Sequence, residues 1–232
     1  MSSTRPSAGR KARADELSAD FPEHQPRAAS AKLALQGIRV VDFTHYIAGP
    51  FSTTIFADMG ADVVKIESPG KGDNLRQYPP MVPAFEGGAP FMRCDRNKCS
   101  IALNLRSPEG LGAAKALIAK ADVVVENSST GVMERLALAY ESCRLLTPGL
   151  TYITVSVYGR EGSFSGRLGL EPIALVESRF ISVNAYPARE GVRAPSPVMD
   201  ISTALQSLVR PLCGPGREEG NRSRWLCSTT SF

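Results

Sequence analysis

The sequence lacks the glycine patterns with which many α/β proteins bind nucleotide phosphates. No G-x-G-x-x-G follows its first apolar run, and no G-x-x-x-x-G-K-[ST] occurs there either. The former pattern is typical of dinucleotide sites and the latter of P-loops. Their absence disfavours an NAD-dependent oxidoreductase, although an α/β fold alone would suit one.

Cysteine, histidine and long apolar runs are also scarce. The five cysteines are scattered without C-x-x-C spacing, and the chain has two histidines. This usage indicates a reduced, cytoplasmic chain without a metal site. No apolar run approaches the length of a membrane span, and no signal peptide is visible, so no membrane partner is expected. The net charge of +4 comes without a dense basic block, which favours no nucleic-acid partner.

Composition divides the chain into three parts. Residues 1–34 are rich in Ser, Ala, Arg and Pro and carry few large apolar side chains. Such a segment cannot offset the entropy of ordering, so a disordered leader is expected. Residues 35–208 carry the apolar patterns of one domain. Beyond Leu208 neither helical nor alternating periodicity continues, and residues 209–232 are expected to be a coil tail.

The stretch from Gly37 to Glu67 predicts a strand, a helix and a second strand. Its first apolar run is rich in β-branched residues, Pro50 suits the first turn of a helix, and Gly60 suits the helix end. A βαβ unit implies a parallel sheet with a right-handed crossover. Further strands are expected near residues 99–105, 121–125 and 150–157. Their alternation with helices predicts an α/β fold with a Rossmann-like, mostly parallel sheet.

Other helices are indicated by their start signals. Ser107 and Pro108 predict an N-cap and a first helical residue. Helices are also expected over 140–146 and 171–180, and Asp200 is expected at or near the N-cap of another. Residues 79–93 show no regular pattern and are expected to be irregular.

The carboxyl ends of the strands are the expected ligand site. The turn from His45 to Pro50 follows the first strand, and free helix N–H groups there can meet an anion. Lys71 and Arg76 lie in a Gly/Pro-punctuated loop after the second strand. Their side chains either present cations to an anionic ligand, or the loop is only a mobile connection between secondary-structure elements.

Three separated blocks of the sequence point to a known family. They read, in order, GIRVVDFTHYIAGPFSTTIFADMGADVVKIESPGKGDNLR, RNKCSIALNLRSPEG and ADVVVEN. As a set they closely resemble class III CoA-transferases, the group of the formyl-CoA and carnitine CoA-transferases. The resemblance covers about residues 35–208, and the family fold continues well beyond that point, so the fold is expected to be incomplete relative to it.

The resemblance implies transfer of coenzyme A from an acyl-CoA to a small carboxylic acid, with no tightly bound cofactor. The family's nucleophile is an aspartate after an extended Pro-Val/Ile segment, and Asp200 in the run PVMDIS matches it. This implies attack on the thioester and an aspartyl-CoA intermediate. A helix start would keep the carboxylate ionised. Without the resemblance, Asp200 would simply be a helix cap.

The same match implies further site residues. Glu171 takes an acidic position near the active site, where it supports the acyl chemistry or only favours its helix start. Asn127 and Arg135 match positions that contact CoA, the alternatives being a loop-capping Asn and a solvated Arg. With the strand-end residues, the expected CoA-binding set is His45, Tyr46, Ile47, Ala48, Lys71, Arg76, Asn127 and Arg135.

The chain also departs from the family. Residues 126–131 read ENSSTG where relatives read E-N-[FY]-x-P-G, and Ser178-Arg179 stands where relatives have Ser-Gly, although Arg adopts φ > 0 less readily. In the family the aspartate is followed by an apolar helix, a T-G-[RK]-G-Q turn and a strand, whereas in this chain that region is expected to be coil. An inactive, truncated or frameshifted member is therefore the alternative to an active enzyme.

A related isomerase is the other alternative. α-Methylacyl-CoA racemases share the superfamily, but their histidine would fall near Leu170, and leucine cannot move a proton. For the complete protein the resemblance implies a homodimer.

Overall fold

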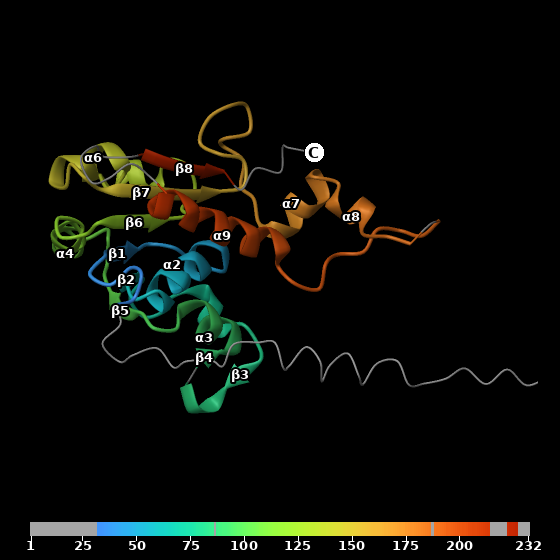
Figure 1. The fold of residues 1–232 in the computed structure, drawn as a ribbon, viewed down its shortest axis with the longest axis horizontal. Coiled ribbons are helices and arrows are strands. Elements are labelled where there is room, and N and C mark those ends of the chain that lie inside the picture. Colours follow the sequence, from blue (N-terminus) through green and yellow to red (C-terminus); the bar gives the residue numbers. More distant parts are fainter. Residues whose placement is uncertain (1–31, 86, 187, 214–221, 227–232) are drawn as a thin grey trace, which may run out of the picture. The chain divides into compact units, whose positions relative to one another are not determined.

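A parallel sheet forms the centre of the structure (Figure 1). The computed structural model describes residues 32–85, 87–186, 188–213 and 222–226, and the described residues from Leu33 onward belong to one unit. The expected leader lies almost wholly outside them. In spatial order the strands are β5 (Cys99–Ala102), β2 (Asp62–Glu67), β1 (Arg39–Asp42), β6 (Val123–Glu126), β7 (Thr151–Ser156) and β8 (Arg222–Leu226).

Every strand pair in this sheet is parallel, as the sequence predicts. Val40 in β1 lies opposite Val63 in β2 and opposite Val123 in β6, which places β1 between them. The crossovers run through helices, as parallel pairing requires. The described helices are α2 (Ala48–Asp58), α3 (Ala89–Asp95), α4 (Pro108–Ile118), α5 (Val132–Arg135), α6 (Tyr140–Leu146), α7 (Glu171–Glu177), α8 (Phe180–Val183) and α9 (Val198–Cys213).

Short elements fill the connection between β2 and α3. They are the 3-10 turn η1 (Asn74–Gln77), β3 (Met81–Val82), the 3-10 turn η2 (Pro83–Phe85) and β4 (Gly87–Gly88), with β3 and β4 paired antiparallel. Residues 79–93 are therefore more ordered than their sequence pattern indicates, because α3 begins at Ala89. Its burial of Cys94 and Asp95 is a tertiary contact that no local periodicity reports.

Helices cover both faces of the sheet, and alternate strand residues enter two apolar cores. On one face Val41 and Val124 pack with Ala114 and Ile118 of α4 and with residues of α6. On the other face the neighbouring residues of the same strands pack with α2 and α9, through side chains such as Phe56 and Leu208. Burial on both faces explains why the strands read as continuous apolar runs.

Local signals in the sequence set several boundaries. Gly60 ends the α2 turn with φ +97°, a conformation that glycine adopts without a Cβ clash. The Ser107 side chain accepts the Gly110 N–H at 3.1 Å, so Ser107 is the N-cap of α4, as predicted. Arg179 has φ +58° between α7 and α8, which divides the single helix expected over 171–180 into two.

The prediction of coil after Leu208 is wrong for two segments. Helix α9 continues to Cys213, and residues 222–226 form β8, which pairs parallel with β7 from Tyr152 to Ser156. Backbone hydrogen bonds to β7 define this strand, and its sequence, RSRWL, has no continuous apolar run that would reveal it. Residues 214–221 and 227–232 lie outside the described part of the chain.

Candidate active site

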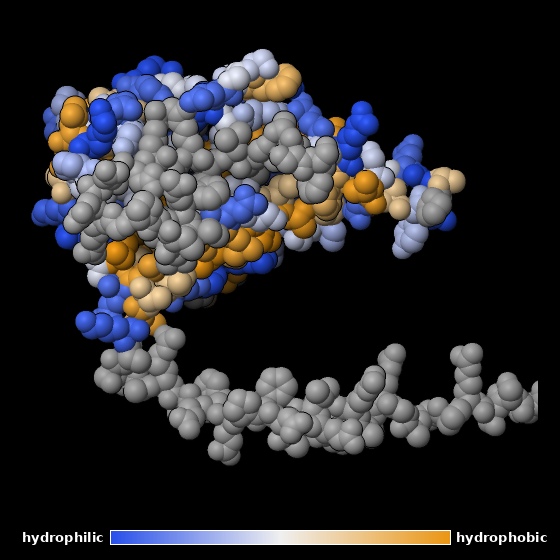
Figure 2. All heavy atoms as spheres, turned by 45° about the horizontal axis from the view of Figure 1, so that its top comes forward, coloured by the Kyte–Doolittle hydropathy of each residue, from blue (hydrophilic) through white to orange (hydrophobic). Residues whose placement is uncertain are grey.

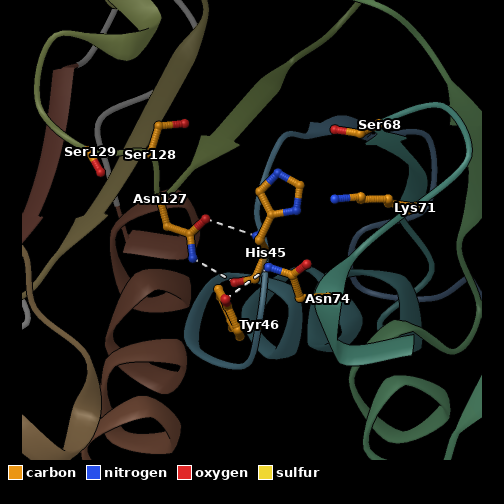
Figure 3. Close-up of a pocket in the computed structure, with 9 residues that line it drawn as sticks. His45, Tyr46, Ser68, Lys71, Asn74, Asn127, Ser128 and Ser129 are labelled. Atoms are coloured by element: carbon orange, nitrogen blue, oxygen red, sulfur yellow. Dashed lines mark hydrogen bonds between the residues drawn. The ribbon is translucent and has the colours of Figure 1, made fainter. Parts of the chain in front are cut away.

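A pocket of about 350 Å³ opens where β1, β2 and β6 end (Figure 3). Its walls come from the β1–α2 turn, the β2–η1 loop and the β6–α5 loop. The pocket lies at the carboxyl ends of strands, where ligands bind in open α/β sheets. The lining residues are His45, Tyr46, Ser68, Lys71, Gly72, Asn74, Asn127, Ser128 and Ser129.

The His45 backbone is held by the side chain of Asn127. The His45 N–H donates to Asn127 Oδ1 at 2.9 Å, and Asn127 Nδ2 donates to the His45 carbonyl at 2.7 Å (Figure 3). Tyr46 follows with φ +64°, which is unusual for a residue that carries a Cβ. Its hydroxyl accepts a hydrogen bond from Asn74 Nδ2 at 2.8 Å. The turn between β1 and α2 is thus tied to both neighbouring loops.

Lys71 and Arg76, the two predicted cations, take different positions. Lys71 lines the pocket beside His45 and Ser68 (Figure 3). Arg76 instead donates from Nε and Nη2 to the two carboxylate oxygens of Glu67, at 2.7 and 2.6 Å. Its guanidinium also lies 3.8 Å from the ring centre of Phe91. A bidentate pair of this kind holds the loop that carries Lys71.

Glu67 is the anchor of that loop. It is 4% exposed and also accepts hydrogen bonds from the Asp73 N–H and the Ser100 hydroxyl. Burial alone would raise the pKa of Glu67, but the hydrogen bonds from Arg76, Ser100 and Asp73 outweigh it and lower that pKa to about 2. Gly72 closes the loop with φ +64°, and a Cβ there would come within 2.6 Å of Glu67 Oε2.

A buried charge cluster adjoins the pocket. Lys65 Nζ lies 2.9 Å from Asp73 Oδ2 and 3.2 Å from Asp95 Oδ1, and it donates to the Thr44 carbonyl at 2.8 Å. Asp73 is fully buried, its Oδ1 accepts the Tyr46 N–H at 3.3 Å, and its Oδ2 lies 3.9 Å from His45 Nδ1. The cluster therefore reaches the pocket wall through Asp73.

The other half of the cluster lies between β1 and α3. Lys98 Nζ pairs with Asp42 Oδ2 at 3.1 Å and with Asp95 Oδ1 at 2.7 Å. Burial alone would raise the pKa of Asp42, but the nearby Lys98 and Lys65 ammonium groups and two threonine hydroxyls hold it below its ordinary value. Desolvation raises the pKa of Asp95 despite the same two cations.

The third wall of the pocket is fixed by Arg160. Its Nη2 donates to both oxygens of buried Glu126 at 2.8 and 3.1 Å and to the Ser128 carbonyl at 2.7 Å. The Ser128 N–H in turn donates to Glu126 Oε2 at 2.8 Å. Desolvation is the main reason that the pKa of Glu126 is raised. The Arg160–Glu126 ion pair therefore holds the loop that starts at Asn127.

Asp200 and Glu171, the predicted catalytic pair, lie together at the start of α9. Asp200 is half-buried in the first turn of that helix, and Glu171 accepts the Met199 N–H at 3.1 Å from the first turn of α7. Burial and the neighbouring Glu171 charge raise the pKa of Asp200 to about 7. Burial and the Glu171 charge therefore act against the ionised form that the helix start is expected to favour. Neither carboxyl group is among the lining residues of the pocket.

The remaining predicted residues flank the pocket. Ile47 is the N-cap of α2 and Ala48 is its first residue. Both follow the His45–Tyr46 turn in the chain, and neither lines the pocket. Arg135 is exposed at the end of α5, after Gly131 at the start of that helix. No three His, Cys, Asp or Glu side chains of the described ranges gather as a metal site. Nor does the described part contain a helix with the length and apolarity to cross a membrane.

One family model accounts for this chain. The model of CoA-transferase family III matches residues 35–210. The chain belongs to CoA-transferase family III. The resemblance of its sequence blocks to class III CoA-transferases is thereby confirmed.

Relatives in CoA-transferase family III support the assignment. An acyl-CoA transferase of Fusarium pseudograminearum is 40% identical over 185 residues, which cover 77% of this chain and 41% of that protein. A succinate–glutarate CoA-transferase of Agrobacterium fabrum is 34% identical, over 82% of this chain and 47% of that protein. The crystal structure of a CaiB/BaiF family protein from Brucella suis superposes with a TM-score of 0.75 at 28% identity, over 85% of this chain and 54% of that one. The chain thus spans about half the length of these relatives.

Four residues that hold the family III pocket are not evident from sequence patterns. They are Lys65, Glu67, Asp73 and Arg160. Lys65 carries one usable signal, since a lone lysine inside the apolar run VVKI must find buried counter-charges once the strand is buried. The partners of the other three come from different loops, which only the folded chain brings together.

Proposed function

We propose that this chain carries the nucleophile and part of the CoA site of an enzyme that transfers CoA from an acyl-CoA to a small carboxylic acid. The observation that supports this most is Asp200, a half-buried carboxyl group in the first turn of α9 beside Glu171, within a family III chain. The relatives' names include succinate–glutarate, succinyl-CoA–L-malate and acetyl-CoA:oxalate CoA-transferases. A small carboxylic acid is accordingly the proposed acceptor, with no tightly bound cofactor.

The proposed chemistry runs through two anhydrides and one thioester on Asp200. The Asp200 carboxylate attacks the acyl-CoA carbonyl and expels CoA thiolate, which leaves a mixed anhydride. The thiolate then attacks the Asp200 carbonyl carbon and releases the donor acid as a carboxylate. The acceptor carboxylate attacks the resulting aspartyl-CoA, expels the thiolate again, and forms a second anhydride. Attack of the thiolate on the acceptor carbonyl gives the new acyl-CoA and free Asp200.

The pocket at the strand ends is the proposed CoA site. Lys71 offers a cation to an anionic ligand, and Ser68, Ser128 and Ser129 offer hydroxyl groups. The N-terminus of α2 has no side-chain cap and follows the His45–Tyr46 turn directly, but its first residues do not line the pocket. Arg135 is proposed to meet CoA at the outer rim. Arg76 is proposed to act on the ligand through the loop that it holds.

The complete protein is proposed to form a homodimer and to be located in the cytoplasm. The family resemblance of the sequence supports the dimer, and the scattered cysteines support the cytoplasmic location. Cys94, Cys99 and Cys143 are free thiols in the described part of the chain, as a reducing compartment favours.

Covalent trapping tests the function. The 232-residue chain is incubated with succinyl-CoA, treated with hydroxylamine or borohydride, and digested for mass spectrometry. We expect the peptide that contains Asp200 to carry the modification, and we expect none in Asp200→Asn. Asp62→Asn changes an exposed carboxylate of β2 and is the matched control, which should be modified like the wild type. No modification of the wild type, or full modification of Asp200→Asn, would reject the proposal.

A further inference from the structure

The His45–Tyr46 turn has a strained backbone that contacts from neighbouring loops must stabilise. It joins β1 to α2 between the two other walls of the pocket. Tyr46 has φ +64°, a backbone conformation that residues with a Cβ avoid unless their surroundings enforce it. The turn therefore depends on contacts with neighbouring loops that hold it in place before any ligand arrives.

Asn127 supplies the first contact, and it uses both ends of its amide. Its Oδ1 accepts the His45 N–H and its Nδ2 donates to the His45 carbonyl, at 2.9 and 2.7 Å. One side chain thus satisfies both backbone groups of a residue 82 positions away. The second Nδ2 hydrogen and the second lone pair of Oδ1 remain available for another partner.

Asp73 supplies the second contact, from the opposite wall. Its Oδ1 accepts the Tyr46 N–H at 3.3 Å and the Leu75 N–H at 2.9 Å, so it joins the turn to η1. Its Oδ2 is buried and forms an ion pair with Lys65 Nζ at 2.9 Å. Lys65 holds this carboxylate in position, because leaving either charge unpaired in the interior is costly.

We propose that Asn127 and Asp73 are positioning residues that preform the CoA pocket by clamping the His45–Tyr46 turn from two sides. Asn127 acts on the ligand through the His45 backbone, whatever contact its own side chain makes with CoA. This inference rests on the proposed CoA site for its effect on affinity. The clamp itself is a property of the unliganded chain and can be measured without CoA.

Amide hydrogen exchange of the unliganded chain tests the clamp. In the wild type we expect the His45 amide to exchange as slowly as the amides of β1, because it is hydrogen-bonded and partly buried. Asn127→Ala should speed exchange at His45 and Tyr46 while the amides of β6 and β7 stay protected. A merely structural role would instead raise exchange throughout the sheet.

The matched control is Asn184→Ala. Asn184 also donates from Nδ2 to a backbone carbonyl, that of Val192 at 2.8 Å, but it lies after α8 and outside the pocket. The Asn184→Ala variant should leave the exchange rate of the His45 amide unchanged. Fast His45 exchange in the wild type overturns the clamp, and this result is available even if Asn127→Ala does not fold.

Calorimetric titration with CoA tests the consequence for the ligand. If the turn is correctly placed in only a tenth of the Asn127→Ala molecules, affinity falls about tenfold, whereas Asn184→Ala should bind like the wild type. Lost His45 protection with unchanged CoA affinity would overturn the positioning role. A wild-type chain that shows the protected turn but no CoA binding would overturn the proposed function and leave the clamp standing.

Discussion

The proposed nucleophile lies at the start of α9, where burial and the neighbouring Glu171 of α7 set its protonation state. Desolvation and the Glu171 charge raise the pKa of Asp200 to about 7. The ionised form attacks, so the reaction should accelerate as pH rises toward 7. Below that value the ionised fraction, and with it the trapping rate, is expected to fall about tenfold per pH unit.

Glu171→Gln isolates the contribution of the neighbouring charge. Glutamine keeps an oxygen that can accept the Met199 N–H but carries no charge, so the pKa of Asp200 should fall. We expect the rise of the trapping rate with pH to move to lower pH. The profile is measured from pH 4 to 9 with succinyl-CoA. Glu177→Gln, on the same helix, is the control. A profile that stays in place would show that Glu171 does not set the ionisation of Asp200.

The same carboxyl group affects folding with a defined sign. A folded-state pKa above the ordinary value means that the folded chain binds the proton more tightly than the unfolded chain does. The contribution of Asp200 to stability is therefore present at acidic pH and is lost as pH rises from about 4 through 7. Asp200→Asn should flatten this dependence in thermal melts at pH 5 and pH 8. An equal pH dependence in wild type and variant would contradict this assignment.

At the scale of elements, the β2–η1 loop depends on two glycines that are not equivalent. Gly70 and Gly72 both have positive φ, but a Cβ meets nothing within 4 Å at Gly70, whereas at Gly72 it meets Glu67 and Arg76 at 2.6 and 2.8 Å. Gly70→Ala should cost only the backbone strain, about 1 kcal/mol. Gly72→Ala should cost more and weaken CoA binding, because it breaks the Glu67–Arg76 pair. Denaturant unfolding and CoA titration compare the two, and equal behaviour would argue against this role of the loop.

The junction between α7 and α8 offers a stabilising change. Arg179 has φ +58°, and glycine adopts this conformation without a Cβ clash. Arg179→Gly is expected to stabilise the chain by roughly 1 kcal/mol. Ser182→Gly, within α8, should instead destabilise it, because helical φ gives glycine no advantage there. Chemical denaturation measures the free energy of unfolding of both variants. A less stable Arg179→Gly would show that the contacts of the Arg179 side chain contribute more than the backbone strain costs.

The sequence predicts the elements that carry their own signals. The βαβ unit, the Ser107 cap of α4 and the strands β5, β6 and β7 follow from apolar runs and cap residues. Helix α3 and strand β8 do not follow from such signals. Helix α3 buries Asp95 against Lys65 and Lys98, and β8 pairs with β7, and both contacts exist only in the folded chain. The site divides in the same way. Strand ends place His45 and Asn127 in one pocket, but the Asn127–His45 clamp joins loops that only the folded sheet brings together.

At the scale of the whole described unit, apolar side chains are concentrated on the surface around α7 and α8. Leu168, Val183 and Tyr186 are each at least 75% exposed, and Val176 is 62% exposed. Figure 2 shows hydrophobic residues along this side of the molecule, among hydrophilic ones. Soluble monomers rarely expose contiguous apolar patches larger than a few hundred Å². This surface is therefore expected to bind a hydrophobic dye.

Charged substitutions test that expectation. The double variant Leu168→Lys/Val183→Lys should lower the fluorescence of bound anilinonaphthalene sulfonate without lowering the melting temperature, because exposed side chains contribute little burial. Leu145→Lys, a 79% exposed position at the end of α6, is the control and should change dye binding less. Undiminished fluorescence in the double variant would place the dye site elsewhere.

The clamp between Asn127 and His45 also has a consequence for synthesis of the chain. The residues of β1, α2 and β2 leave the ribosome before those of β6, because synthesis runs from the N-terminus. The pocket cannot form at that stage, because its third wall starts at residue 127 and needs β6 beside β1. A nascent chain halted before that point has no complete binding site. Its substrate therefore gives the first half of the chain no help in folding.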